Sequence, residues 1–491
     1  MRSVETDANR GRVQWVAAEV TGHSAGRQHQ LITVSKGSSA VALGEEPQLI
    51  HNPPKPHTRR WVLPFGINFS SDRAVSQGFL SLADQAVASI TNFATGVIIA
   101  RATSKDEFGL YMLGFTLILL VTDLQTSLIA TPYMVYAPRL QGNDHANYTG
   151  STLIHQVLFS LLTTLVLICA ACAAAFGVGP KGLGPVLWAL SGVATLIMFR
   201  EFVRRMCFAG LKLKTALLFD AFIGIGQICG LLVLAHFKAL SASRAYWLIG
   251  ATCGVAELCW LWRNRHLYRL SVHEAVTDLK RNWIFGKWVF ASGLLWTAST
   301  NLYPWLLAFF HGTAAAGVFA ACLGVISASN PALLGIQNFL GPKIAHVYAT
   351  RGRAGLRRFI LRTSASLAVP VSLLALVLIL WGDRFVGLLY GSRYTGNGQV
   401  VAILAVNLLL SAVVFSFSRA LFAIERADLD FVLNFAAIAI MLTLGLWLVK
   451  THGPLGAAIG LLVAGSVTSV LRVGAFLRLF TGTTNQEMQI R

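Results

Sequence analysis

Polar side chains recur at helical spacing inside long apolar segments of this 491-residue chain. One segment carries Gln85, Ser89 and Asn92 at positions i, i+4 and i+7, with Asp84 beside them. A polar group that faces lipid is costly, so such a face should point toward protein or water. Amides and hydroxyls can donate and accept hydrogen bonds, and a carboxylate accepts them. The pattern favours a hydrated binding site at membrane depth, with interhelical packing as the alternative for any single residue.

Three further apolar segments carry polar faces of the same kind. They are the second, seventh and eighth along the chain, so the four segments open the two halves of the sequence. We expect them to surround one central cavity, with Asn92, Asp123, Asn301 and Asn338 facing it. The full set of candidate cavity residues is Asp84, Gln85, Ser89, Asn92, Asp123, Gln125, Asn301, Asn330 and Asn338. Asp84 and Asp123 are also the candidates for an H+ or Na+ site.

Two arginines could meet an anionic substrate at the mouth of such a cavity. Arg200 is followed by Glu201, which is typical of a local ion pair but leaves contact with the cavity open. Arg419 lies at the expected end of the tenth helix, where a long cationic side chain also extends toward the interface and marks orientation. A substrate contact and a structural role are both open for these arginines.

The segments that position these residues are long enough to cross a membrane. Hydrophobic residues make up 55% of the chain and charged residues 12%, and a spanning helix needs about 20 apolar residues. The expected helices cover residues 78–101, 107–133, 152–177, 184–206, 215–237, 244–262, 286–310, 314–340, 359–381, 397–420, 431–449 and 455–478. The sequence therefore predicts an all-α polytopic membrane protein, with about 12 transmembrane helices in two six-helix lobes.

Basic residues predict the orientation and the division of the chain. The connections on one side, including the central loop, are rich in Lys and Arg, and such connections face the cytoplasm. We expect a cytoplasmic (inner) membrane protein with both termini inside. The expected parts are a disordered tail (1–74), a first lobe (75–265), an inter-lobe loop (266–285), a second lobe (286–480) and a short tail (481–491).

Several function classes are disfavoured by the same observations. The net charge of +19 is spread over loops instead of forming one basic patch, so we expect no nucleic-acid partner. Cys169 and Cys172 have CxxC spacing without a second pair, which makes a metal site improbable. We identify no catalytic residue, no metal ligands and no cofactor. A polyprenol-dependent glycosyltransferase stays as a less favoured alternative, because the expected outer loops are short.

A weak internal repeat supports the division into halves. Thr91-Asn92-Phe93 precedes Phe108-Gly109-Leu110-Tyr111, and Thr300-Asn301-Leu302-Tyr303 precedes Ala316-Gly317-Val318-Phe319 at nearly the same spacing. A duplication with an even number of helices per half is parallel, with its axis along the membrane normal.

The stretch 82–140 resembles the opening of a known transporter family. It carries Asp84-Gln85, Asn92-Phe93, Ala100-Arg101 and Glu107 to Tyr111. This skeleton is similar to that of polysaccharide flippases in the multidrug/oligosaccharidyl-lipid/polysaccharide exporter (MOP) superfamily, and the likeness extends over about residues 75–480. Arg101 matches an arginine of the family, although the expected topology places it at the outer end of the first helix.

The resemblance implies a function that the residues alone do not. Such proteins move a polyprenyl-pyrophosphate-linked oligosaccharide between leaflets for exopolysaccharide, capsule or O-antigen synthesis, with membrane lipid and other polysaccharide-assembly proteins as partners. Polar cavity residues would bind the sugar, and Arg200 or Arg419 would contact the pyrophosphate. Coupling to H+ or Na+ is open. The alternative within the superfamily is a cation-coupled multidrug exporter.

Overall fold

The computed structural model describes residues 72–424 and 426–481, which lie within one compact unit. The predicted tails, 1–74 and 481–491, therefore fall almost entirely outside the described residues. In the described part the chain forms helices joined by short turns, with no strand.

The first half contains seven α-helices and three short helical segments. The elements are α1 (Asp72–Ala102), α2 (Lys105–Gln125), π-helical η1 (Thr126–Ala130), α3 (Thr131–Tyr136), η2 (Ala137–Arg139), α4 (Gly142–Ala175), α5 (Leu183–Ala209), α6 (Leu213–His236), α7 (Ala242–Asn264) and η3 (Arg265–Leu267). Helices α2, η1 and α3 follow one another without a break, so they form the single helix expected over 107–133.

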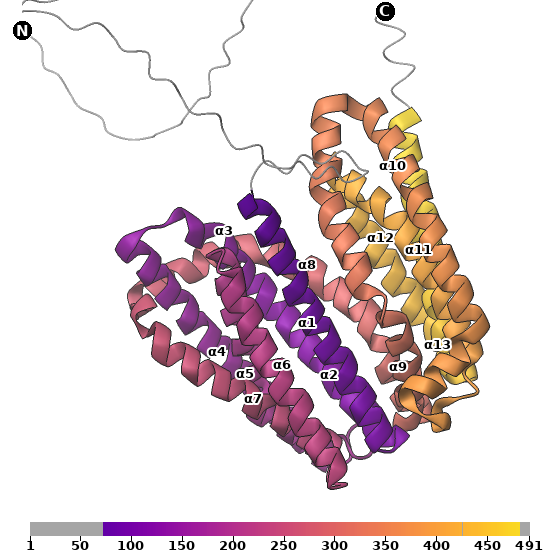
Figure 1. Cartoon of the computed structure of the whole chain (residues 1–491), viewed down its shortest axis with the longest axis horizontal. Coiled ribbons are helices and arrows are strands. Elements are labelled where there is room, and N and C mark those ends of the chain that lie inside the picture. The colour runs from indigo at the N-terminus through magenta and orange to yellow at the C-terminus, as the bar shows by residue number, and fades with distance from the viewer. Residues whose placement is uncertain (1–71, 425, 482–491) are drawn as a thin grey trace, which may run out of the picture. The chain divides into compact units, whose positions relative to one another are not determined.

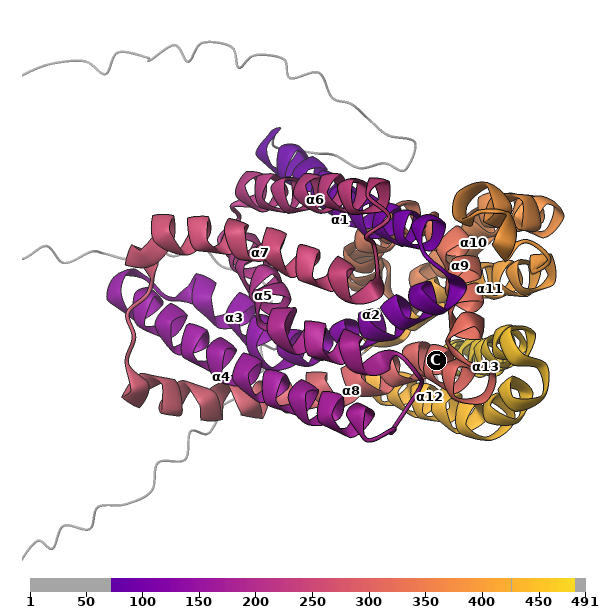
Figure 2. The same cartoon turned by 90° about the horizontal axis from the view of Figure 1, so that it is seen from below.

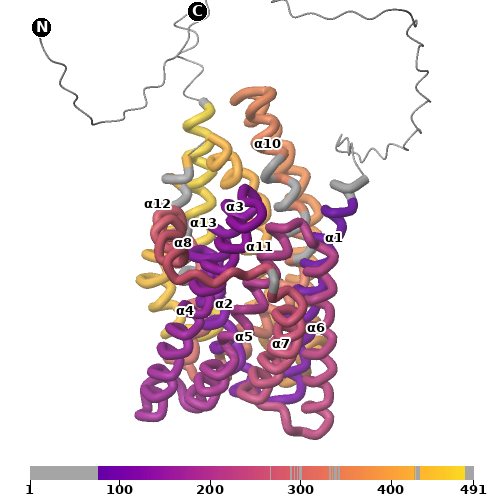
Figure 3. The backbone as a smooth tube through the Cα atoms, turned by 90° about the vertical axis from the view of Figure 1, so that its left-hand side faces the viewer, coloured from indigo at the N-terminus to yellow at the C-terminus, as the bar shows by residue number. Residues whose placement is uncertain are grey.

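The second half has the same plan in six α-helices and two short helical segments. They are α8 (Val272–His311), α9 (Thr313–Ser327), α10 (Asn330–Tyr390), η4 (Ser392–Tyr394), α11 (Gly398–Ala423), α12 (Ala427–Ile440), η5 (Met441–Gly445) and α13 (Leu446–Thr481). Gly352 (φ +60°) and Gly453 (φ +57°) each break one of these elements into two helices. Glycine adopts positive φ at little cost, so the chain folds back there. Figures 1 and 3 show α10 turning back at the end where α1 begins and α13 ends.

The predicted all-α membrane architecture is confirmed. All twelve expected ranges are helical apart from short turns and end residues. Eight helical stretches are long and apolar enough to cross a membrane. Helix α4 exposes Val157, Leu158, Leu161, Leu162 and Leu165 on one stripe, a spacing that places one helix face outside the protein. An exposed apolar stripe of this kind suits contact with lipid.

The inter-lobe segment is more ordered than the sequence predicted. Residues 266–285 were expected to form a loop, but α8 begins at Val272 and includes most of them. Ser271 caps the helix by accepting a hydrogen bond from the Glu274 backbone. On α4, the Tyr148 hydroxyl donates to Asn282 (2.9 Å) and His155 bonds the Ala275 carbonyl (2.8 Å). These long-range contacts hold a basic, less apolar stretch in a helix.

Helices pack mainly within each half. In the first half, which we call the first lobe (α1–α7), α4 lies on α5, α1 on α6, and α5 on α7. In the second lobe (α8–α13), α11 lies between α10 and α13 (Figure 1). The lobes meet through α2 and α9, which lie against each other in Figure 2.

The contact between α2 and α9 is reciprocal. A Cβ added to Gly109 would lie 1.9 Å from the Thr313 carbonyl oxygen, and a Cβ added to Gly317 would lie 2.3 Å from the Lys105 carbonyl oxygen. Gly317 and Thr313 are the counterparts of Gly109 and Lys105 in the internal repeat. Exchanging the two lobes thus reproduces the contact, which is the relation expected from a parallel duplication.

Candidate functional site

The polar side chains of α1 fall into two groups, one partly buried or exposed and one buried inside the first lobe. Gln85 is partly buried and donates to Ser89 (3.4 Å), and Asn92 is exposed. Asp84 is fully buried, as is Thr95, which accepts a hydrogen bond from Gln227 of α6 (2.7 Å). The sequence analysis placed Asp84 on the face that was expected to line the cavity. The structure instead turns it toward α5 and α6, inside the first lobe.

Asp84 belongs to a buried network of opposite charges. Arg204 of α5 donates to Asp84 Oδ2 from Nη2 (2.7 Å) and from Nε (3.1 Å). The same Nε lies 2.9 Å from Oδ2 of Asp220 on α6. Both carboxylates are fully buried, and Arg204 is 15% exposed. One guanidinium therefore joins α5 and its neighbour α6 to α1, which is distant from both in the sequence.

Arg200 also belongs to this network, and its guanidinium is paired with Asp220. Its Nη2 and Nε lie 3.0 and 3.1 Å from Asp220 Oδ1. Glu201 pairs with Arg205 (2.6 Å) and approaches Arg204 (3.6 Å) on the same helix. A buried charge is tolerated only when it is paired and hydrogen-bonded. Together, six residues form what we call the α1–α5–α6 ion network: Asp84, Arg200, Glu201, Arg204, Arg205 and Asp220. Its geometry favours the local ion pair over a substrate contact for Arg200.

The predicted faces of the second and seventh helices do meet. The hydroxyl of Thr297 on α8 donates to the Asp123 carboxylate on α2. Asn301, one turn further along α8, donates to the Thr297 carbonyl (3.1 Å), and Trp305 donates to Thr116 of α2 (2.8 Å). Asp123 is nonetheless exposed. The structure therefore brings Asp123 and Asn301 together at the contact between the lobes.

Three other candidates have different surroundings. Gln125 is buried and donates to the Met198 carbonyl of α5 (2.8 Å), so it serves packing within the first lobe. Asn330 is exposed at the start of α10. The side chain of Asn338 lies outside the described residues.

Arg419 differs from Arg200 in its partners. Its guanidinium lies over the rings of Phe415 (4.9 Å) and Phe422 (5.8 Å), and the residue is exposed on α11. Among the carboxylates whose side chains the structure describes, none forms an ion pair with it. An arginine stacked on aromatic rings keeps its N–H donors available for an anion.

The sequence analysis did not identify a second arginine, Arg281, whose guanidinium also packs against aromatic rings. Arg281 of α8 lies 3.8 Å from the ring centroid of Tyr136 and 6.0 Å from that of Tyr148. Phe285, one turn along α8, lies 5.9 Å from Tyr136. The cluster forms because α8 begins within the expected loop and then packs against α3 and α4. The local sequence does not predict this packing.

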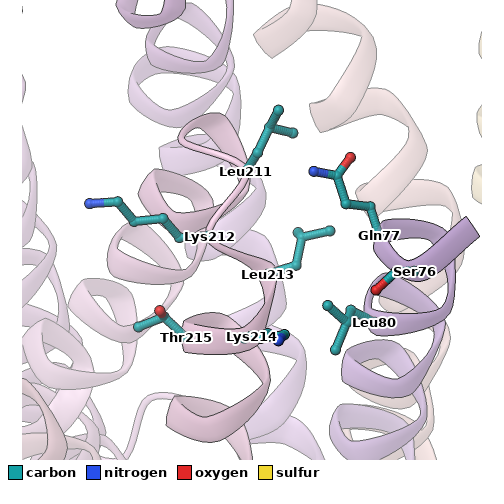
Figure 4. Close-up of a pocket in the computed structure, with 8 residues that line it drawn as sticks. All are labelled: Ser76, Gln77, Leu80, Leu211, Lys212, Leu213, Lys214 and Thr215. Atoms are coloured by element: carbon teal, nitrogen blue, oxygen red, sulfur yellow. The ribbon is translucent and has the colours of Figure 1, made fainter. Parts of the chain in front are cut away.

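A pocket of about 450 Å³ lies between the start of α1 and the turn from α5 to α6. Ser76, Gln77 and Leu80 line one side, and the segment 211–215 lines the other. Figure 4 shows Lys212 directed away from α1, whereas Leu213 points toward it. The lining combines the polar residues Ser76, Gln77 and Thr215 and two lysines with three leucines.

Comparison with known proteins agrees with this architecture. The model of the family "Polysaccharide biosynthesis protein" matches residues 75–348. The lipopolysaccharide biosynthesis protein WzxC of Escherichia coli (strain K12) is 22% identical over 275 residues, which are 54% of this chain and 55% of that protein. The match thus spans about half the length of this curated relative.

Solved transporters share the fold at low sequence identity. An inward-facing multidrug resistance MATE family transporter of the MOP superfamily has a TM-score of 0.69 at 15% identity, covering 81% of this chain and 95% of its own. An outward-facing one scores 0.58 at 15% identity, with coverages of 84% and 96%. A MOP superfamily transporter from Pyrococcus furiosus scores 0.59 at 14% identity, with coverages of 83% and 95%.

Since the family model covers more than half of the chain, this multi-pass membrane protein, whose helices share the fold of the solved MOP transporters, belongs to the polysaccharide biosynthesis protein family.

Proposed function

We propose that the protein transports a polyprenyl-pyrophosphate-linked oligosaccharide across the cytoplasmic membrane by alternating access, for synthesis of a surface polysaccharide. Membership of the polysaccharide biosynthesis family carries this proposal. The likeness to WzxC, a lipopolysaccharide biosynthesis protein, supports it. A sugar head and a pyrophosphate do not cross hydrocarbon unaided, because each unsatisfied polar group costs several kcal/mol. A polar path between two lobes removes that cost.

The proposed orientation places both termini in the cytoplasm. Arg351, Arg353, Arg357 and Arg358 flank the turn of α10 at Gly352. This turn lies at the end of the molecule where α1 begins and α13 ends (Figure 3). Basic connections favour the cytoplasmic side.

Arg419 is our candidate for the pyrophosphate contact. Its guanidinium stacks on aromatic rings, whereas the guanidinium of Arg200 is paired with Asp220. Gln85, Ser89, Asn92, Asn301, Asn330 and Asn338 would supply hydrogen bonds to sugar hydroxyls. Other polysaccharide-assembly proteins would supply the substrate and use the product.

Asp123 is the better candidate if transport is coupled to H+ or Na+. It is an exposed carboxylate at the contact between lobes, and its partner Thr297 is on the other lobe. Asp84 already has a cationic partner in Arg204. A bound cation at Asp123 would therefore change an interlobe contact, which is the requirement for a coupling residue.

The test is leaflet-resolved analysis of lipid-linked glycans in cells with and without the protein. We expect loss of the protein to leave intact lipid-linked oligosaccharide on the cytoplasmic face and to abolish the surface polysaccharide. An unchanged distribution would reject the proposal and favour the multidrug exporter alternative, for which the fold likeness to MATE transporters speaks. Dye efflux by wild type and by Asp123→Asn would then test that alternative.

A further inference from the structure

Two arginines connect the lobes at the end opposite to the turn at Gly352, which we call the distal end. Arg101, in the last turn of α1, donates through Nε to the Leu389 carbonyl (2.8 Å) and through Nη2 to the Leu388 carbonyl. Arg393, in η4, donates through Nη1 to the Thr103 carbonyl and through Nη2 to the Arg101 carbonyl (3.3 Å). Each arginine thus reaches the helix end that carries the other.

Helix physics explains why these contacts form. The last four carbonyls of a helix have no partner within the helix. Leu388 and Leu389 belong to the last turn of α10, which ends at Tyr390, and Arg101 belongs to the last turn of α1. The C-terminal end of a helix also carries a partial negative charge that favours a cation. Each guanidinium therefore caps a helix of the opposite lobe.

Aromatic and polar residues beside the arginines make further contacts at the same end. Phe108 of α2 packs on Tyr390 and Tyr394, with ring centroids 5.9 and 6.1 Å apart. Asp106 accepts a hydrogen bond from Thr313 of α9 (2.6 Å). Burial raises the pKa of Tyr394 to about 12. The distal contact thus combines an aromatic core with a rim of exposed arginines.

We propose that Arg101 and Arg393 form a reciprocal latch that holds the distal end closed in this conformation and must release for the lobes to open there. Both arginines are exposed, so water can replace the carbonyls as their partners. Alternating access by rigid-body rocking requires a contact that is made in one state and broken in the other. The higher TM-score to the inward-facing transporter is consistent with a closed distal end.

The latch rests on the alternating-access part of the proposed function, and its test needs no substrate. Spin labels are placed on the exposed residues Lys181 and Arg384, near the distal end of each lobe, after replacement of the native cysteines. A second pair, Lys214 and Arg358, reports on the opposite end. Pulsed electron paramagnetic resonance then gives the distance distributions in nanodiscs. A wrong substrate leaves these distances unaffected, so the two proposals can fail separately.

The decisive variant is Arg101→Gln combined with Arg393→Gln. Loss of charged hydrogen bonds on both lobes should lower the ratio of distally closed to distally open molecules by about tenfold. The distal distance should lengthen as the opposite one shortens. The matched control is Arg244→Gln, because the Arg244 guanidinium donates to a backbone carbonyl, that of Ala239 (2.6 Å), within the first lobe. It should leave both distributions unchanged.

Two results would overturn the latch. One is a double variant whose distance distributions coincide with those of wild type. The other is an equal shift in Arg244→Gln, which would show a general effect of losing an arginine. If the double variant does not fold, the two single variants carry the same test with a smaller expected shift.

Discussion

Replacing Asp220 by Asn should destabilise the first lobe more than the matching replacement of either other acid in the α1–α5–α6 ion network. Asp220 is fully buried and is the partner of Arg200 through Oδ1 and of Arg204 through Oδ2. Removing its charge leaves both guanidinium groups short of a counter-charge. Breaking a buried pair in this way costs about 3–5 kcal/mol.

Asp84→Asn should cost less, although Asp84 is equally buried. Arg204 keeps Asp220 and Glu201 as partners in that variant. We expect a loss of about 1–3 kcal/mol, the cost of one weakened buried hydrogen-bonding group. The order of stability is then wild type, Asp84→Asn, and Asp220→Asn. Glu201→Gln should lie closest to wild type, because Glu201 is 21% exposed.

The assay is thermal unfolding of the detergent-purified protein, followed by tryptophan fluorescence. For a unit of 150–250 residues, 1 kcal/mol corresponds to about 2–4 °C, so Asp220→Asn should melt roughly 10 °C below wild type. The structural role of Asp84 would be refuted if Asp84→Asn melted with wild type and yet abolished transport. That result would return Asp84 to the list of coupling residues.

Three further expectations can be checked in the same preparations. Arg419→Gln should reduce substrate transport at least about tenfold, as for a lost charged contact, without changing the melting temperature, and Arg358→Gln should leave both as in wild type. Gly109→Val should block close packing of α2 on α9, because even a Cβ would overlap the Thr313 carbonyl oxygen, and should lengthen the distal label distance. Thr297→Val, which removes the donor to Asp123, should change ion dependence if transport is coupled; identical dependence in wild type and variant would reject Asp123 as the coupling site.

The proposed distribution of roles separates stability from transport. The charges that hold the first lobe together are paired with one another inside it, whereas Asp123, Arg101 and Arg393 contact the opposite lobe. An alternating-access protein needs this separation, because contacts within a lobe must survive a motion that breaks contacts between lobes.

Side-chain type and spacing were enough to identify the membrane class and the helices. Apolar stretches of about 20 residues predict spanning helices without knowledge of their neighbours. The same local pattern placed Asp84 and Gln85 on one polar face, although they point to different partners in the structure. Adjacent positions on a helix are about 100° apart, so a widened polar face can serve two environments. The sequence does not indicate which.

Contacts between segments that are far apart in the sequence determined the charge pairs and the helical form of the inter-lobe segment. Arg204 lies 120 residues from Asp84, and Arg393 lies nearly 300 residues from Arg101; no local pattern predicts such pairs. The expected loop over 266–285 became helical because it packs on α4. Local periodicity reflects the free energy of placing one helix in lipid, and it therefore determined the class, the helices and the polar positions. The pairing of charges depends on how helices pack against one another, and only the tertiary structure shows that Asp84 and Arg200 stabilise a lobe while Arg101 and Arg393 connect two.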